Sequence, residues 1–443
     1  MGWSPAEPGR MAPSRRQFLG GVGAIAGAIA LSACSGGGSG GGTGIGQASG
    51  GPVTGPLTPF FGEGGKDLGQ GLVWTHGMNL ALTGTGASIG LAMSQGAAVA
   101  ADLMKKSGGP SITLKQSDHQ GGLVGPAVSG VRRMVLREKI LSLGSSYGPA
   151  TTALFPFAKE SKLTTFWSGG AGPAGLDQDF IWITMALFAV DPAPGALAFM
   201  AQKYPEAKNL ALIGQKENGV SALTEIAPKV WPEVSSGGKV VAEEYADIGT
   251  KDFSSTVARV KATQADVIFS TVYGNDQGYL IKQLRESGVT APIMNIDLAV
   301  PTVPDIAGSA LTKDCFLAVD GYQPENPNPY NKVFVDAYTS AYGSAPDYFA
   351  ANFFETTNIL AGAIAAAVKS GKEPGLNDVL NQTLAANPRW PSVYGGSATE
   401  PGFIEFQEDH SAVKPIGVFE IGGAGKLTKL ATITKGSTKV LPA

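Results

Sequence analysis

The sequence predicts an α/β protein with two lobes, each built around a parallel sheet. Three observations support this fold class. Short apolar runs alternate with amphipathic stretches from Gly77 onward, the alternation occurs twice, and the early runs are almost continuously apolar. Strand–helix alternation is typical of parallel sheets with helices on both faces, and strands buried on both faces are apolar throughout.

The composition describes a globular, mildly acidic chain. Of its 443 residues, 43% are hydrophobic and 16% are charged, and the formal net charge is -3. The length is enough for two or three domains of roughly 100–200 residues. Without a basic stripe or patch, nucleic acid and anionic lipid surfaces are not expected partners. The 2 Cys and 3 His residues argue against a zinc cluster or a disulfide scaffold, so we expect no metal and no cofactor.

The N-terminus carries an export signal. Arg15 and Arg16 precede a weakly hydrophobic run from Phe18 to Ala33. This run is shorter than the roughly 20 residues that cross a bilayer, so residues 1–33 are interpreted as a twin-arginine signal peptide. Met1 and Met11 are alternative starts.

The signal ends in Leu31-Ser32-Ala33-Cys34, which resembles a bacterial lipobox. Cys34 is then the lipidated residue, and the alternative is an ordinary signal peptide that contains a cysteine. Residues 34–65 are expected to form a Gly/Ser-rich tether that starts at the lipid anchor. If Cys34 is acylated, Cys315 has no partner, and its apolar neighbours indicate a buried thiol.

Ten strands follow from the apolar runs, in two sets of five. They are Met78–Leu82, Ser111–Gln116, Ile140–Leu143, Thr164–Trp167 and Phe180–Met185, then Leu210–Ile213, Val240–Tyr245, Val267–Thr271, Pro292–Ile296 and Phe316–Val319.

Helices are expected between most of these strands. They are Leu91–Lys106, Val124–Arg137, Ala196–Lys203, Asp252–Ala262 and Gln277–Glu286, followed by three helical stretches between Tyr330 and Leu384. Asp252 and the serines after it supply N-cap side chains for the helix that they begin. Ser287-Gly288 ends the helix Gln277–Glu286. The last elements are an antiparallel pair of strands, Gly402–Phe406 with Ile416–Ile421.

A Gly/Ser loop follows the third strand. Gly144-Ser145-Ser146-Tyr147-Gly148 matches the G-x-S-x-G elbow of α/β-hydrolases, with Ser146 as nucleophile. A catalytic triad requires a histidine further along the chain, and only His410 follows, in a polar turn. The competing interpretation is a loop whose N–H groups and hydroxyls hold an anionic ligand group.

A second loop of this kind follows the next strand, in Ser168-Gly169-Gly170. Ligands of open α/β sheets bind outside the carboxyl ends of the strands, so both loops are expected at one place. Tyr273 and Asp297 end consecutive strands of the second half. Asp297 is either a helix N-cap or a ligand carboxylate, and each Gly/Ser loop is either a ligand loop or a plain turn.

These residues, in this order, resemble the leucine/isoleucine/valine-binding family of ABC-transporter solute-binding proteins, of periplasmic binding protein type I. The resemblance covers about 77–434. It is carried by Leu82-Thr83-Gly84, Gln116-Ser117-Asp118, Leu143-Gly144-Ser145-Ser146, Lys251-Asp252-Phe253-Ser254, Val272-Tyr273-Gly274 and the stretch from Lys332-Val333-Phe334 to Tyr342-Gly343.

The resemblance implies two Rossmann-like lobes joined by three crossovers, with a ligand trapped between them. It assigns residues 66–190 and 321–410 to lobe 1, and 191–320 and 411–434 to lobe 2. It places the ligand carboxylate on Ser145, Ser146 or Tyr147 and on Ser168, Gly169 and Gly170. It gives Tyr273 a ligand-facing ring and Asp297 the ammonium group. Asn218 stands where the family has tyrosine.

The function that the resemblance implies is that of a lipid-anchored, extracytoplasmic solute-binding protein. Its partners would be a small ligand, either an amino acid or a related amide or aromatic acid, and the permease of an ABC importer. No enzymatic activity is expected. The alternatives are a ligand-sensing module for a receptor kinase and a serine hydrolase that uses Ser146.

Overall fold

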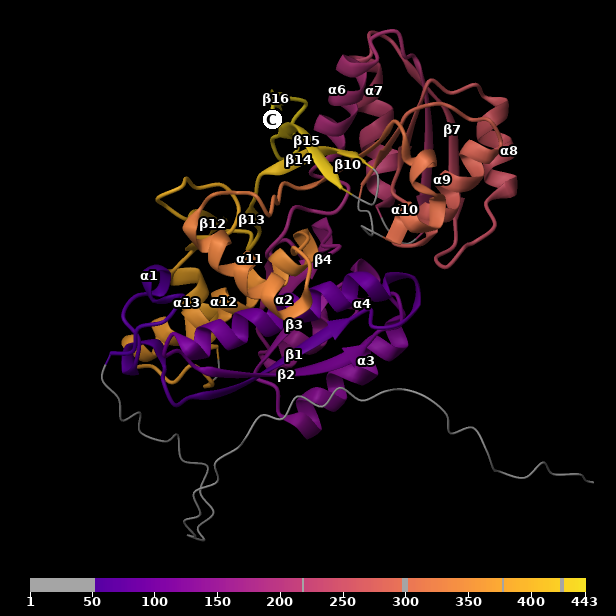
Figure 1. Ribbon diagram of the computed structural model, residues 1–443. Helices are drawn as coiled ribbons and strands as arrows, with labels where there is room; N and C mark the ends of the chain where they lie inside the picture. The colour runs from indigo at the N-terminus through magenta and orange to yellow at the C-terminus, as the bar shows by residue number, and fades with distance from the viewer. Residues whose placement is uncertain (1–51, 217–218, 297–301, 377, 423–425) are drawn as a thin grey trace, which may run out of the picture. The chain divides into compact units, whose positions relative to one another are not determined.

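The computed structural model describes residues 52–443, except 217–218, 297–301, 377 and 423–425. Cys34, Asn218 and Asp297 therefore lie outside the described residues. Two large sheets organise the chain (Figure 1), and we call the elements around them lobe 1 and lobe 2. Both lobes belong to one compact unit.

Lobe 1 contains a five-stranded parallel sheet in the order β2-β1-β3-β4-β5. Its strands are β1 (Val73–Leu80), β2 (Ser111–Asp118), β3 (Ser142–Ser146), β4 (Thr165–Gly169) and β5 (Ile181–Ile183). Its helices between strands are α2 (Ala87–Lys106), α3 (Val124–Arg133), α4 (Gly148–Thr152) and α5 (Phe155–Ser161). Strands β3, β4 and β5 are buried throughout, although only β5 is apolar throughout and β3 contains three serines.

Lobe 2 contains an eight-stranded sheet in the order β16-β15-β14-β10-β9-β8-β6-β7. The parallel strands are β6 (Asn209–Gln215), β7 (Lys239–Ala246), β8 (Val267–Ser270), β9 (Ile293–Asn295) and β10 (Cys315–Asp320). The helices are α6 (Ala193–Lys203), α7 (Ala227–Val234), α8 (Ser254–Ala262), α9 (Asp276–Glu286) and α10 (Thr302–Ala307). The predicted burial of Cys315 is confirmed, and burial raises the pKa of its thiol to about 11.

The last part of the chain corrects one prediction. Helices α11 (Pro329–Tyr342), α12 (Tyr348–Lys369) and α13 (Val379–Ala386) lead to a small sheet of β11 (Arg389–Ser392), β12 (Gly402–Phe406) and β13 (Ala412–Val413). The prediction that β12 pairs with β14 (Ile416–Ile421) is wrong. Strand β12 pairs with β11 and β13, whereas β14 pairs antiparallel with β10 and with β15 (Leu427–Ile433), which in turn pairs with β16 (Val440–Pro442).

Helix α12 belongs to lobe 1, where it packs along α2 (Figure 1). The two backbones approach so closely that a Cβ on Gly96 would lie 2.0 Å from the carbonyl oxygen of Ala350. Only glycine fits at position 96 of this contact. Helix α12 is almost entirely buried, and its N-cap residue Asp347 accepts a hydrogen bond from the N–H of Ala350 at 2.9 Å.

The chain passes between the lobes three times, as the family resemblance implies. It leaves lobe 1 after β5, returns after β10, and leaves again between β13 and β14. We call these segments the crossovers.

Residues 52–72, which we call the strap, pack against lobe 1 ahead of β1. They include α1 (Thr58–Phe61) and a 3₁₀ turn, Lys66–Leu68. Leu57 is fully buried, and the rings of Phe60 and Tyr330 have centroids 4.9 Å apart. Residues 52–65, expected to be the end of the linker, are thus part of the lobe 1 surface. The strap holds its place because these apolar side chains leave water.

A buried polar cluster connects all three crossovers to α12. Lys414, in the third crossover, lies 2.6 Å from a carboxylate oxygen of Glu355 and donates to Asn352 Oδ1 at 2.7 Å. Asn352 Nδ2 donates to Asp320 Oδ2 at 2.9 Å, at the start of the second crossover. Asp320 Oδ1 accepts from the N–H of Ala186, in the first crossover, at 3.0 Å. We call this set the hinge cluster.

The hinge cluster generates a stability prediction. Lys414→Met leaves the Glu355 carboxylate buried without its cation, so we expect a loss of about 3–5 kcal/mol in the free energy of unfolding, measured by urea denaturation. The control is Lys332→Met, which breaks an exposed pair with Asp336 and should cost less than about 1 kcal/mol. The double variant Lys414→Met/Glu355→Gln should recover part of the loss. Equal, small losses in both single variants would contradict the proposed importance of the cluster.

Candidate functional site

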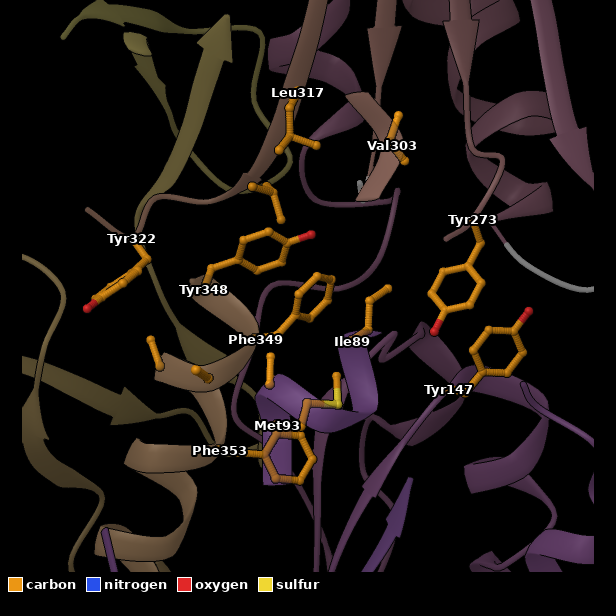
Figure 2. Packing of buried hydrophobic residues seen from close by; sticks show 14 of the residues in the cluster. Ile89, Met93, Tyr147, Tyr273, Val303, Leu317, Tyr322, Tyr348, Phe349 and Phe353 are labelled. Carbon is orange, nitrogen blue, oxygen red and sulfur yellow. The ribbon is translucent and has the colours of Figure 1, made fainter. Parts of the chain in front are cut away.

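The carboxyl ends of parallel strands from both lobes meet at two tyrosines. Tyr147 follows β3 in lobe 1, and Tyr273 follows β8 in lobe 2. Their ring centroids are 4.8 Å apart at an interplanar angle of 64°, an edge-to-face contact (Figure 2). Ligands of open α/β sheets bind at such strand ends, so this contact marks the candidate site.

Tyr147 has an unusual backbone conformation, with φ at 72° and ψ at 128°. Positive φ is rare for a bulky residue and is held in place by its surroundings. The N–H of Tyr147 donates to the carbonyl of Gly169 at 2.7 Å. A Cβ on Gly122 would lie 2.1 Å from the Tyr147 ring, so the ring depends on glycine at that position. The structure thus places this side chain at the interface between the lobes by a strained turn.

Ser145 and Ser168, one from each predicted Gly/Ser loop, form hydrogen bonds inside lobe 1. Ser145 Oγ lies 2.8 Å from the hydroxyl of Thr151. Ser168 Oγ lies 2.7 Å from both the Thr184 and the Thr356 hydroxyls. Both serines are fully buried. Their hydroxyls brace the loops, and Ser146, Tyr147 and Gly169 beside them are buried as well, whereas Gly170 is half-buried.

His119 is a member of this site that sequence reasoning did not assign to it. It follows β2, and its Nε2 lies 3.2 Å from Ser146 Oγ. Its Nδ1 accepts the N–H of Gly122 at 2.9 Å, so the neutral ring carries its proton on Nε2 and donates to Ser146. Burial lowers the pKa of His119 to about 4.

This tautomer is the wrong one for serine hydrolysis. A catalytic histidine must accept the serine proton on Nε2, whereas here Nε2 is the donor. The other histidine considered, His410, stacks on Trp182 with centroids 4.2 Å apart. Ser146 and His119 therefore form a positioning pair rather than a nucleophile and base.

A hydrogen bond links the lobes directly beside the tyrosines. Thr85, at the turn before α2, donates from Oγ1 to Asp276 Oδ1 at 2.7 Å. Asp276 begins α9 and also accepts from Gln215 Nε2 at 2.9 Å and from the N–H of Gly249 at 2.6 Å. A Cβ on Gly274 would lie 2.7 Å from the Thr85 carbonyl oxygen. Lobe 1 and lobe 2 are therefore in contact, and we call the Thr85–Asp276 bond the latch.

An apolar crevice lies deeper between the lobes, against the hinge. It is lined mainly by Ala186, Phe188, Ile296, Tyr348 and Phe349, and it has a volume of about 20 Å³. A buried water needs roughly 10–15 Å³ by this measure, so the crevice holds about one water. Figure 2 shows Tyr348, Phe349 and Ile89 filling the space between Tyr322 and the tyrosine pair. In this conformation the crevice is therefore too small for an amino acid.

Other kinds of site find no support in the described part of the chain. Its residues contain no group of three or more His, Cys, Asp or Glu side chains placed to hold a metal ion. None of its helices is both long enough and apolar enough to cross a membrane.

Comparison with known proteins identifies relatives over most of these elements. The sequence profile of the Periplasmic binding protein family matches residues 74–426. A Leu/Ile/Val-binding protein homolog of Brucella suis is 25% identical over 256 residues, which are 55% of this chain and 65% of that protein. The chain thus spans slightly less than two thirds of that curated relative's length.

Solved structures share the fold. The branched-chain amino acid transporter substrate binding protein of Streptococcus pneumoniae, in complex with isoleucine, has a TM-score of 0.67 and 21% identity, covering 84% of this chain and 100% of that one. An ABC transporter solute binding protein from R. palustris, in complex with benzoate, has a TM-score of 0.70 and 18% identity, covering 83% and 99%. At these identities the likeness establishes the two-lobed α/β architecture.

The His119–Ser146 pair predicts a pH dependence of stability. The folded pKa of His119, about 4, is below the value of 6.5 in the unfolded chain, so the unfolded state binds more protons between these values. The contribution of neutral His119 to the free energy of unfolding is therefore complete above about pH 6.5 and is lost as the pH falls toward 4. We expect the wild type to lose about 2–3 kcal/mol more than His119→Gln between pH 7 and pH 4, measured by urea unfolding.

His76 provides an internal reference, because burial also lowers its pKa, to about 3, and it is present in both proteins. Its contribution therefore cancels in the comparison. Identical pH profiles for the wild type and His119→Gln would show that His119 is not the buried neutral donor described above.

Proposed function

Because the chain belongs to the periplasmic binding protein family, we propose that it captures an amino acid or a similar small ligand between its lobes and delivers it to an ABC importer. Members of this family bind solutes and are not enzymes, in agreement with the expectation that no catalysis takes place. The observation that carries the proposal is the meeting of Tyr147 and Tyr273 at strand ends of different lobes. Each lobe supplies one part of the site.

The proposed ligand contacts combine residues from both lobes. From lobe 1, Ser146, Tyr147 and the backbone of Gly169 and Gly170 would hold an anionic group, because hydroxyls and N–H groups hydrogen-bond carboxylates well. From lobe 2, Tyr273 would cover the ligand. Ser145 and Ser168 would act by bracing these loops.

Two further contacts are proposed from the sequence. Asp297 directly follows Ile296, which lines the crevice, and its carboxylate would pair with an ammonium group. Asn218, adjacent to Gly219, would face the ligand where related proteins carry tyrosine. The relatives bind isoleucine in one case and benzoate in another, so an amino acid and an aromatic acid are the two classes to separate.

Closure would work as a population shift. A ligand that touches both lobes stabilises the closed arrangement, whereas a ligand that touches only one lobe has little differential affinity. In the described conformation the crevice is too small for an amino acid, and the latch holds the lobes together. We infer that the lobes open to admit the ligand and that the latch reforms around it.

Attachment to the membrane is a separate proposal. Cys34 would be acylated after export, which would place the protein on the extracytoplasmic face of the membrane. The strap begins 18 residues later in the sequence, at Pro52, and packs on lobe 1. The anchor would therefore hold the protein through lobe 1.

The ligand class can be tested by a thermal-shift screen over amino acids, amides and aromatic acids. A ligand that binds only the folded state at about 100 times its Kd stabilises it by about 2.7 kcal/mol and raises the Tm. Tyr273→Ala should weaken binding at least about tenfold, or ~1.4 kcal/mol, because the ligand loses its aromatic cover. Tyr342→Ala, at an exposed tyrosine of α11, is the matched control and should bind normally.

Asp297→Asn separates the two ligand classes in the same assay. Loss of binding for amine-bearing ligands but not for aromatic acids would assign the ammonium contact to Asp297. If no compound of these classes raises the Tm, or if Tyr273→Ala binds as tightly as the wild type, the proposed site is wrong.

Lipidation can be tested by fractionation. We expect the full-length protein to sediment with membranes and Cys34→Ser to be soluble, because position 34 then has no thiol to which a lipid can be attached. Cys315→Ser is the matched control, since that thiol is buried in β10, and it should remain with membranes. Sedimentation of Cys34→Ser with the membranes would refute the anchor.

A further inference from the structure

A second cavity lies along the second crossover, next to the apolar crevice. Its walls come from α2, α11, the loop that leads into α12, the second crossover itself, and β14 and β15 of lobe 2. We call it the crossover cavity. Its volume is about 450 Å³, which is within the range of roughly 300–1,000 Å³ for small-molecule sites. Unlike the crevice, it therefore has room for a small molecule.

The crossover cavity is distinct from the proposed ligand site. Neither Tyr147 nor Tyr273 lines it. Figure 2 shows Tyr322, which does line it, separated from the tyrosine pair by Tyr348 and Phe349. The cavity and the crevice are neighbours, because three residues line both of them: Val319, Asp320 and Tyr348.

Aromatic rings form much of the cavity wall, namely those of Tyr322, Tyr338, Tyr348 and Phe419. Two of these rings are fixed by their hydroxyls. Tyr322 Oη donates to Asn331 Oδ1 at 3.0 Å, and Tyr338 Oη donates to Gln95 Oε1 at 2.7 Å. The wall also contains aliphatic side chains, among them Leu91, which is 56% exposed. The cavity is thus lined by rigid aromatic rings rather than by free hydrogen-bond donors of these two phenols.

A carboxylate without a cation also lines the cavity. Asp347 is half-buried there, and its Oδ1 caps α12. Burial, and after it the charge of Asp347, raises the pKa of the Tyr322 and Tyr338 phenols, so this negative charge acts on both rings. Burial also raises the pKa of Asp347 to about 6, and no basic side chain among the described residues opposes that shift.

The other charged groups of the wall do not supply this cation. Asp320 is bound within the hinge cluster, and Glu325 and Lys426 are exposed and of opposite charge. A cation beside a carboxylate and against aromatic faces is stabilised by both. A quaternary ammonium group fits such walls best, because its methyl groups are apolar and it has no N–H that needs an acceptor.

We propose that the crossover cavity binds a small organic cation of the quaternary ammonium class, held against the rings of Tyr322 and Tyr338 and beside the carboxylate of Asp347. This inference goes beyond the proposed function, since it uses no residue assigned to the ligand site. Because the walls come from both lobes, the bound cation would join α2 and α11 of lobe 1 to β14 and β15 of lobe 2.

The test uses choline and 3,3-dimethylbutan-1-ol, which has the same shape but a carbon atom in place of the charged nitrogen. We expect choline to bind the protein with one-to-one stoichiometry by calorimetry, at least about tenfold more tightly than the alcohol. Asp347→Asn keeps a good N-cap residue and should weaken choline about tenfold without affecting the alcohol. Asp336→Asn, at an exposed position of α11 outside the cavity, is the matched control and should bind choline normally.

A positive charge added to the wall locates the site. Leu91→Lys places an ammonium group at an exposed position of the cavity and should weaken choline at least about tenfold. Leu136→Lys, at an exposed leucine outside the cavity, should leave choline binding unchanged. Tyr273→Ala should bind choline as the wild type does, which separates this test from that of the proposed function. No binding of choline, equal affinity for the alcohol, or unchanged affinity in Asp347→Asn or Leu91→Lys would each overturn the proposal.

Discussion

The structure depends on one buried ionic contact, between Lys414 and Glu355. The two side chains are almost fully buried, and Asn352 extends their network to Asp320 and, through it, to the backbone of Ala186. These groups lie on α12 and on each of the three crossovers. Burial raises the pKa of Asp320, while Lys414 lowers it, so the cation also helps to keep that carboxylate charged. Segments far apart in sequence are thus held at one point between the lobes.

Around that point, the site is made from conformations that need glycine. Tyr147 projects from a positive-φ turn because Gly122 leaves room for its ring, and Gly274 allows Thr85 to approach α9. His119 and Ser146 stabilise the same turn from within lobe 1. Rigid parts of the site therefore lie within each lobe, and the contacts that join them include the latch, the bond from the Asn275 N–H to the Thr85 carbonyl and the tyrosine pair. A ligand that bridges the lobes, as proposed, would add its binding energy to these contacts.

The sequence predicted the architecture well, because apolar runs and helix ends are local signals. Sequence-based prediction failed where a contact depends on the direction of a side chain or joins segments that are far apart in the sequence. Successive strand residues point to opposite faces, so Ser145 and Ser146 could not both face a ligand. This alternation is a general property of strands and could have been used to separate the two serines from the sequence alone. His119 also follows a parallel strand and could have been placed at the same edge. The latch could not be predicted, because it depends on the angle between the lobes. The predicted pairing of β12 with β14 was wrong because the third crossover lies between these strands, which are close in sequence but belong to different sheets.

The strap has a mechanical consequence. Its buried side chains attach the chain to lobe 1 before the first strand begins, and none of the crossovers lies between the strap and that lobe. Tension applied to the polypeptide ahead of Pro52 is therefore borne by lobe 1 alone and does not load the hinge. In the proposed closure, lobe 2 would therefore move without pulling on the N-terminal segment, and a force on that segment would not shift the balance between open and closed forms.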